Sequence, residues 1–285
     1  MSYQVPAVGY PPANPDEHTH TVIFLHGEGE TALDCCERFV RLTGSCGQTF
    51  RQEFPTIRWV FPKAASPNGW FPVRWRNQPT IDQHLQAEGL GRSVMRLRSV
   101  IHREAELLGR RYHRIVIAGF SQGASVAVLA LLTFKYPEDL QEFPRLGGLF
   151  CVGGRLPFAG RNLEEIRTIL NLPVAPVNNM VVYHTPILIQ HNHDDQVTPV
   201  RHGCQTYDGL DYVGANPIWR EYLRGGHWFN KPAGVDDTVA FLGTALGIGR
   251  WGQNRGDVVW SGRLPMPSQA EVCAYYGKTV DDDEW

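Results

Sequence analysis

The sequence predicts an α/β protein with a mostly parallel central sheet and helices on both faces. Short apolar runs at 21–25, 57–61, 114–118 and 186–191 alternate with segments of helical periodicity, which is typical of strands joined by crossover helices. The runs are apolar along their whole length, as expected of strands that are covered on both sides. With 285 residues and 42% hydrophobic content, the chain is large enough to bury such a core.

Prolines, apolar runs and a helix cap predict the elements of the N-terminal part of the chain. The first 20 residues contain four prolines and are expected to form an extended N-terminal arm. Residues 21–25 form the first predicted strand. A helix is predicted to begin at Thr31, because Thr31 and Asp34 have the spacing of a capping box. The run 57–61 is the next strand.

The middle of the chain leads into the strand at 114–118. An aromatic stretch with Pro and Gly over 68–75 predicts a loop. Apolar residues recur at helical spacing from 81 to 108, which predicts a long crossover helix. The apolar segment 124–132 after the strand predicts another helix.

The C-terminal half is predicted to contain a strand at 146–152, an irregular insert over 154–184, strands at 186–191 and 217–223, and a final helix over 235–246. The Gly- and Pro-rich segment 247–285 has no clear period. We expect it to form a C-terminal tail, packed on the domain or partly flexible. One domain over 21–246, between an arm and a tail, is therefore the expected organisation.

Charge and composition exclude several classes of function. A formal net charge of −2 gives no basic surface for nucleic acid, and no stretch is apolar enough to span a bilayer. The N-terminus lacks the features of a signal peptide, and the six cysteines have no disulfide-like spacing. We therefore expect a cytoplasmic protein with reduced thiols.

The sequence Gly119-Phe120-Ser121-Gln122-Gly123 is the strongest chemical signal. It lies between the strand at 114–118 and the helix at 124–132, so Ser121 is placed at the apex of a sharp strand-to-helix turn. Bulky residues two positions before and after that serine would collide with the strand and the helix. Gly119 and Gly123 avoid this collision, and the pattern predicts a nucleophilic serine at the N-terminal end of a helix.

A serine nucleophile needs a histidine base and an acid that orients the histidine. In proteins with this serine turn, the chain order is serine, acid, histidine. Asp194 and Asp195 follow the strand at 186–191, and spacing alone does not decide between them. His202 lies too close to them to reach back easily, whereas His227 follows Gly225-Gly226 after the next strand. His227 is therefore the predicted base.

Four motifs in order resemble the phospholipase/carboxylesterase family, which contains acyl-protein thioesterases and lysophospholipases of the α/β-hydrolase fold. The motifs are Phe24-Leu25-His26-Gly27-Glu28-Gly29, Gly119-Phe120-Ser121-Gln122-Gly123, His191-x-x-x-Asp195-x-Val197-x-Pro199 and Gly226-His227. The resemblance covers residues 20–246. It implies a serine hydrolase that cleaves carboxylic esters or thioesters through an acyl-enzyme and needs no cofactor and no metal.

The resemblance also implies roles for individual residues. Asp195 rather than Asp194 would be the triad acid. The backbone N–H of Gln122, which follows the nucleophile, is a predicted oxyanion donor, and the family pattern implies Glu28 as the second. The Glu28 carboxylate is expected to face solvent or a cationic neighbour, since it would otherwise oppose a negative transition state. Asn192 stands where the family has glycine.

Aromatic residues near the strand ends suggest an apolar acyl pocket. Trp70, Phe71 and Trp228 are the candidate substrate-binding residues, with Trp59, Phe61 and Trp75 close by in the pattern. The expected substrate is a small or lipid-like acyl ester or an acylated protein.

Other functions remain open at this point. His191-x-His193-x-Asp195 resembles part of a metallohydrolase ligand set, but Gln196 stands where that set needs a histidine. An esterase or lactonase acting on small soluble esters would show the same motifs. A binding protein without turnover would be favoured by a missing triad member, and none is missing.

Overall fold

The computed structural model describes residues 6–74, 81–172, 176 and 178–249. Within these residues, seven strands form one sheet in the order β1-β3-β2-β4-β5-β6-β7. All neighbouring pairs are parallel except β1 and β3. The strands are β1 (Ala7–Tyr10), β2 (His20–Leu25), β3 (Ile57–Pro62), β4 (Ile115–Phe120), β5 (Gly148–Val152), β6 (Ile187–Asn192) and β7 (Pro217–Tyr222). The predicted α/β architecture with a mostly parallel sheet is confirmed.

The predicted N-terminal arm contributes to this sheet. Residues 7–10 form β1, the antiparallel edge strand, with Val8 opposite Phe61 and Tyr10 opposite Trp59. A 3-10 turn at Pro15–Glu17 then leads into β2. The predicted extended arm over residues 1–20 therefore includes an edge strand, because the backbone of 7–10 pairs with β3.

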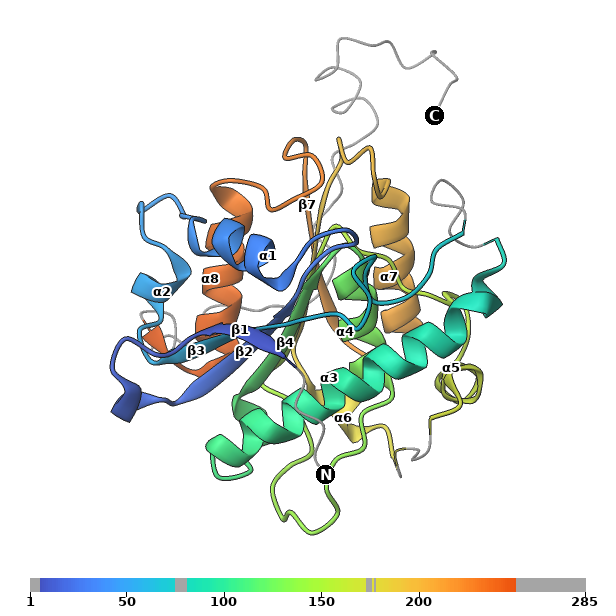
Figure 1. Ribbon diagram of the computed structural model, residues 1–285, viewed down its shortest axis with the longest axis horizontal. Helices are drawn as coiled ribbons and strands as arrows, with labels where there is room; N and C mark the ends of the chain where they lie inside the picture. The colour runs from blue at the N-terminus through green and yellow to red at the C-terminus, as the bar shows by residue number, and fades with distance from the viewer. Residues whose placement is uncertain (1–5, 75–80, 173–175, 177, 250–285) are drawn as a thin grey trace.

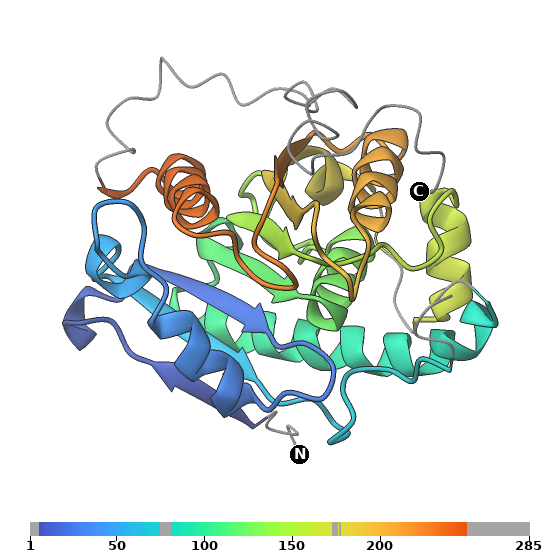
Figure 2. The same ribbon diagram turned by 90° about the horizontal axis from the view of Figure 1, so that it is seen from above.

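Helices cover both faces of the sheet, as Figures 1 and 2 show. In both views α1 and α8 lie on one side of the strands, and α4, α5 and α7 lie on the other. The α-helices are α1 (Ala32–Val40), α2 (Phe50–Glu53), α3 (Ala87–Leu107), α4 (Gln122–Leu132), α5 (Leu163–Leu170), α6 (Met180–His184), α7 (Val200–Tyr212) and α8 (Ala233–Leu246).

Each face of the sheet has its own core. Alternate residues of a strand point to opposite faces, so Val22 and Phe24 of β2 pack with α1 and α8, whereas Ile23 and Leu25 pack with α3 and α4. The helix α4 is buried along its whole length. That burial explains why its sequence is apolar all round rather than on one stripe.

Capping determines where α1 begins. The Thr31 side chain accepts a hydrogen bond from the Asp34 N–H, and the Asp34 carboxylate accepts one from the Thr31 N–H. This is the capping box that the sequence predicts.

The predicted irregular insert over 154–184 contains two helices. Asn162 and Glu165 form a capping box at the start of α5, and Leu163, Ile166 and Leu170 are buried on one of its faces. The short α6 follows. Residues 173–175 and 177 of this segment lie outside the described residues, as do residues 250–285 of the predicted tail.

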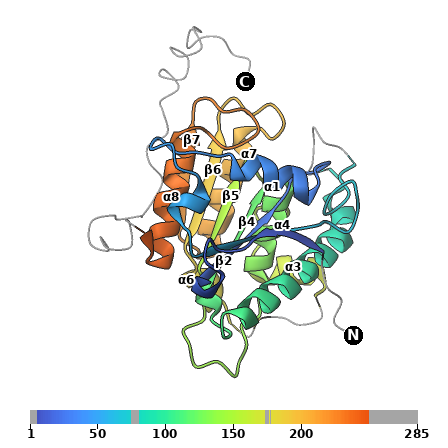
Figure 3. The ribbon, with the colours of Figure 1, turned by 60° about the vertical axis from the view of Figure 1, so that its left-hand side comes forward.

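The carboxyl ends of the parallel strands meet at one edge of the sheet, where open α/β sheets build their sites. Figure 3 shows β4, β5, β6 and β7 side by side between α8 and α4. The loops after β4, β5, β6 and β7 carry Ser121, Gly153, Asp195 and His227 respectively. Among the helices described, none is long and apolar enough to cross a bilayer.

Candidate active site

Ser121 occupies a strained turn between β4 and α4. Its backbone has φ 54° and ψ −120°, a left-handed conformation that is uncommon for a residue with a side chain. A Cβ on Gly123 would lie 2.5 Å from the Leu25 carbonyl oxygen, and a Cβ on Gly119 would collide with the backbone of Gly123. The two glycines therefore allow β2, β4 and α4 to approach one another closely enough to hold this turn.

Three side chains form a continuous chain of hydrogen bonds. The Ser121 Oγ lies 2.9 Å from Nε2 of His227, and Nδ1 of the same ring lies 2.7 Å from Oδ2 of Asp195. In the tautomer that this geometry requires, Nδ1–H donates to Asp195, and Nε2 accepts from the serine hydroxyl. The structure thus brings together the serine, histidine and acid proposed from the sequence.

Asp195 is buried and held as a carboxylate. Its Oδ1 accepts hydrogen bonds from the N–H groups of Val197 and Thr198 at 2.9 and 2.8 Å. Burial raises the pKa of Asp195, but hydrogen bonds from His191, His227 and Thr198 outweigh burial and hold the pKa well below its usual range. The His191 contribution is the weaker one geometrically, because its Nε2 lies 2.7 Å from the Thr198 carbonyl and 3.4 Å from Asp195.

Asp194 has a different task from its neighbour. Its carboxylate accepts hydrogen bonds from the N–H groups of Gly226 at 2.8 Å and Gly225 at 3.3 Å. It therefore binds the loop before His227 and not the imidazole. This separation settles on geometric grounds which of the two aspartates contacts the histidine.

Asn192 holds the same loop from the end of β6. Its Nδ2 donates to the carbonyl oxygens of Gly226 at 2.8 Å and Trp228 at 2.6 Å, on either side of His227. Sequence reasoning noted Asn192 only as a departure from glycine. Its role could not be found there, because the contact joins residues 34 and 36 positions apart.

The first proposed oxyanion donor is the N–H of Gln122. As the first residue of α4, Gln122 has a backbone N–H without an acceptor inside the helix. Its side chain is also engaged: Oε1 accepts from the Trp70 N–H at 2.6 Å, and Nε2 donates to the Phe71 carbonyl at 2.8 Å. The residue after the nucleophile thereby fixes the aromatic loop against the serine turn.

The peptide between Gly27 and Glu28, which would supply the second donor, is fixed by its neighbours. Nδ1 of His26 lies 2.8 Å from the Gly27 carbonyl oxygen, and Nε2 of the same ring accepts from the Ala64 N–H at 3.3 Å. In a trans peptide the C=O and the following N–H point in opposite directions. By holding the Gly27 carbonyl, His26 therefore sets the direction of the Glu28 N–H.

Glu30 completes this arrangement. Its carboxylate accepts from the Gly27 N–H at 2.9 Å and forms an ion pair with Arg38. The Arg38 guanidinium also lies over the Trp228 indole, 3.8 Å from the ring centroid. Glu30 and Arg38 thus link the Gly27 loop to the loop that carries His227.

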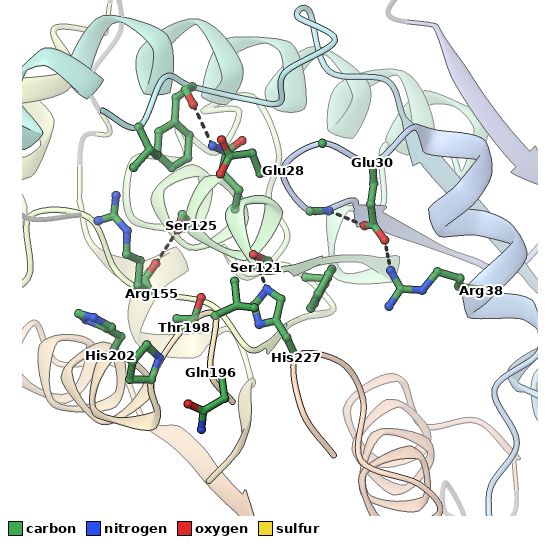
Figure 4. A pocket seen from close by; sticks show the side chains of 18 residues that line it. Glu28, Glu30, Arg38, Ser121, Ser125, Arg155, Gln196, Thr198, His202 and His227 are labelled. Carbon is green, nitrogen blue, oxygen red and sulfur yellow. Dashed lines mark hydrogen bonds and ion pairs between the residues drawn. The ribbon is translucent and has the colours of Figure 1, made fainter. Parts of the chain in front are cut away.

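Ser121 and His227 line a cavity of about 540 Å³ together with Gln122 and Glu28 (Figure 4). Glu28 is half-buried in the cavity wall, and the expectation that its carboxylate faces solvent or a cationic neighbour stays a prediction. Phe71 and Phe120 give the wall apolar surface, whereas Arg38 and Arg155 give it positive charge. The wall therefore combines apolar surface with two cationic side chains, and the expected apolar acyl pocket stays a prediction.

Two of the three candidate substrate-binding aromatics do not line this cavity. Trp70 is buried, donates from its indole N–H to the His26 carbonyl at 2.8 Å and packs on the His26 ring. Trp228 packs edge-on against Phe120 beneath Arg38. Trp59 and Phe61 are buried in the core on the α1 side, and Trp75 lies outside the described residues. Phe71 alone of the three reaches the cavity.

Comparison with known proteins assigns the chain to a family. The family model described as Phospholipase/Carboxylesterase matches residues 12–231, which is most of the chain. The chain belongs to the phospholipase/carboxylesterase family. The resemblance noted in the sequence is confirmed.

Curated relatives and solved structures agree with membership of this family. The acyl-protein thioesterase 1 of Schizosaccharomyces pombe is 34% identical over 190 residues, covering 64% of this chain and 71% of that protein. The acyl-protein thioesterase 1 of Gibberella zeae is 26% identical, covering 79% and 90%. The crystal structures of esterase PE8 and of Zea mays acyl-protein thioesterase 2 align with TM-scores of 0.62 and 0.59 at 21% identity. They cover 84% and 85% of this chain and 98% and 100% of their own, which shows the α/β-hydrolase fold.

The departure from the family pattern at Asn192 gains a structural meaning. Asn192, in place of glycine, supplies the two hydrogen bonds to the His227 loop. Among the described residues of this family member, no three His, Cys, Asp or Glu side chains are grouped as metal ligands would be.

Proposed function

We propose that this chain is a serine hydrolase of carboxylic esters and thioesters, with Ser121 as nucleophile, His227 as base and Asp195 as the orienting acid. The observation that carries the proposal is the hydrogen-bonded chain from Ser121 to His227 to Asp195, at 2.9 and 2.7 Å, at the wall of the cavity. Membership of the phospholipase/carboxylesterase family supports the same chemistry.

These positions support a reaction in two stages, acylation of Ser121 and hydrolysis of the acyl-enzyme. His227 takes the proton of Ser121 as Oγ forms a bond to the acyl carbon, and the tetrahedral intermediate collapses with cleavage of the C–O or C–S bond. His227 protonates the leaving alcohol or thiol. Water then attacks the acyl-enzyme, giving its proton to His227, and the acid leaves as the proton returns to Ser121. Asp195 remains a carboxylate throughout and stabilises the transient imidazolium.

The N–H groups of Gln122 and Glu28 are the proposed donors to the oxyanion. Each donor of this kind contributes about 3–4 kcal/mol to transition-state stabilisation in enzymes where one has been removed. His26 holds the carbonyl of the Gly27–Glu28 peptide, Glu30 holds the Gly27 N–H on the preceding peptide, and both act here as positioning residues.

Cleavage of thioesters, as well as of carboxylic esters, is the more specific part of the proposal. The curated relatives named above are acyl-protein thioesterases, and the proposed serine mechanism cleaves a C–S bond in the same way as a C–O bond. An S-acylated peptide is therefore the first physiological substrate class to test, alongside small soluble esters.

A fluorophosphonate probe and a paired assay test the proposal. The wild type should be labelled covalently and should hydrolyse both p-nitrophenyl butyrate and an S-acyl cysteine peptide, and Ser121→Ala should lose labelling and both activities. Ser125→Ala is the matched control, because Ser125 also lines the cavity but donates to the Arg155 carbonyl. Undiminished labelling of Ser121→Ala would refute the assignment of the nucleophile.

A further inference from the structure

Arg155 lies in the loop after β5, a segment that the catalytic mechanism does not use. Its backbone is fixed, because the Ser125 hydroxyl donates to the Arg155 carbonyl at 2.8 Å. Gly153, two residues earlier in the same loop, lies next to the histidine–acid pair, and a Cβ there would come 3.3 Å from Oδ2 of Asp195. The Arg155 side chain is thus presented from a rigid part of the site into the same cavity that Ser121 lines.

The guanidinium of Arg155 is held in place without being neutralised. Nη2 donates to Oε1 of Gln86 at 2.6 Å, and the group lies 5.9 Å from the centroid of the Phe71 ring. Among the described residues, no carboxylate forms an ion pair with it. Burial lowers the pKa of Arg155 to about 10, so it remains a cation at neutral pH despite partial desolvation.

The second arginine that lines the cavity, Arg38, differs from Arg155 in having an ion-pair partner. Arg38 is paired with Glu30 and lies over Trp228, so its charge is already balanced. In Figure 4, Glu30 and Arg38 lie on one side of Ser121, and Arg155 and His202 lie on the other. Burial lowers the pKa of His202, which therefore adds no positive charge at neutral pH. Of the two arginines that line the cavity, Arg155 is therefore the one without a carboxylate ion pair among the described residues.

We propose that Arg155 binds a carboxylate of the substrate, so that the site prefers esters or thioesters with a negative charge away from the scissile bond. The inference rests on the proposed hydrolase function. A planar guanidinium matches a carboxylate with paired hydrogen bonds, and a partly desolvated cation without a counter-ion favours an anionic ligand. A single carboxylate suits the cavity better than a phosphate dianion, because one cation is available and Glu28 already adds a carboxylate to the wall.

Matched substrates test the preference. p-Nitrophenyl hydrogen suberate and p-nitrophenyl octanoate have acyl chains of equal length and differ in one terminal carboxylate. 4-Carboxyphenyl octanoate and phenyl octanoate place the same difference on the leaving group. In at least one pair, Arg155→Met should lower kcat/KM for the anionic member about 10- to 100-fold while changing the neutral member less than threefold, because a charge-assisted hydrogen bond is lost. Arg155→Lys should retain part of the preference.

Controls separate this role from folding and from long-range charge. Arg161→Met removes the same charge from an exposed residue of the same segment and should leave both ratios unchanged.

Equal effects of Arg155→Met on the charged and neutral members of both pairs would overturn the proposal. Activity of Ser121→Ala on the neutral esters would instead refute the hydrolase mechanism itself.

Discussion

Nδ2 of Asn192 lies 2.6 Å from the carbonyl oxygen of Trp228, so the last residue of β6 directly holds the residue that follows His227. A second bond from the same amide reaches the Gly226 carbonyl. The base is therefore carried by a short loop whose two ends are attached to the strand that presents Asp195. The distance between His227 and Asp195 depends on this attachment.

We expect Asn192→Ala to lower kcat about tenfold with little change in KM, because the loop loses two hydrogen bonds while the cavity wall is untouched. Steady-state kinetics with p-nitrophenyl butyrate will measure this. Asn230→Ala is the control, since Asn230 donates to the Arg224 carbonyl elsewhere in the same loop. A larger loss of kcat in Asn230→Ala than in Asn192→Ala would contradict the assignment.

The neighbouring aspartates should differ strongly when each is changed to asparagine. Asp195→Asn should lower kcat by about 10⁴, since the amide no longer selects the reactive tautomer of His227. Asp194→Asn should cost less than tenfold, because an amide oxygen can still accept from Gly226. Comparable losses in both variants would mean that Asp195 does not orient the base.

Gly123→Ala should strongly lower the stability of the fold. The added Cβ would lie 2.5 Å from the Leu25 carbonyl and 2.6 Å from the His26 carbonyl, and neither backbone group can move without displacing β2. Gly160→Ala has no atom within 4 Å of the new Cβ and a φ of 84°, so it should cost only about 1 kcal/mol from backbone strain. Thermal denaturation followed by circular dichroism compares the two, and equal melting temperatures would refute the close approach.

Acid should destabilise the fold through His20. Burial, together with the nearby Arg114, His113 and His18, lowers the pKa of His20 from 6.5 to about 4. Between these values the unfolded chain binds a proton at His20 and the folded chain does not, so stability falls as the pH is lowered from 6.5 towards 4. The free energy of unfolding in urea should drop by up to about 2 kcal/mol between pH 7 and 5 from this group. His20→Gln should reduce that drop, and an unchanged drop would show that other groups cause it.

Local patterns were sufficient to place the catalytic candidates and most of the fold. The serine turn needs glycines at fixed positions, and the strand runs are apolar because both faces of the sheet are covered. Chain order then left His227 as the base. Asp194 and Asp195 could not be distinguished from spacing, because adjacent residues at a strand end can each turn toward the histidine.

Contacts between distant segments were beyond the reach of the sequence. Trp70 is a large aromatic residue of the kind that lines acyl pockets, yet its indole N–H donates to the His26 carbonyl in the core. Residues 7–10 form a strand by pairing with the edge of β3, about 50 residues later in the chain. Arg155 lay in a predicted irregular insert, where nothing local indicates that its side chain enters the cavity.

The Glu30–Arg38–Trp228 contact has a consequence for motion. It joins the loop of the proposed oxyanion donor to the loop of the base, two segments nearly 200 residues apart in the chain. Each loop must break its contact with Arg38 before it can open, so one side chain restrains both loops. Amide exchange at residues 27–30 and 226–228 should therefore accelerate together in Arg38→Ala.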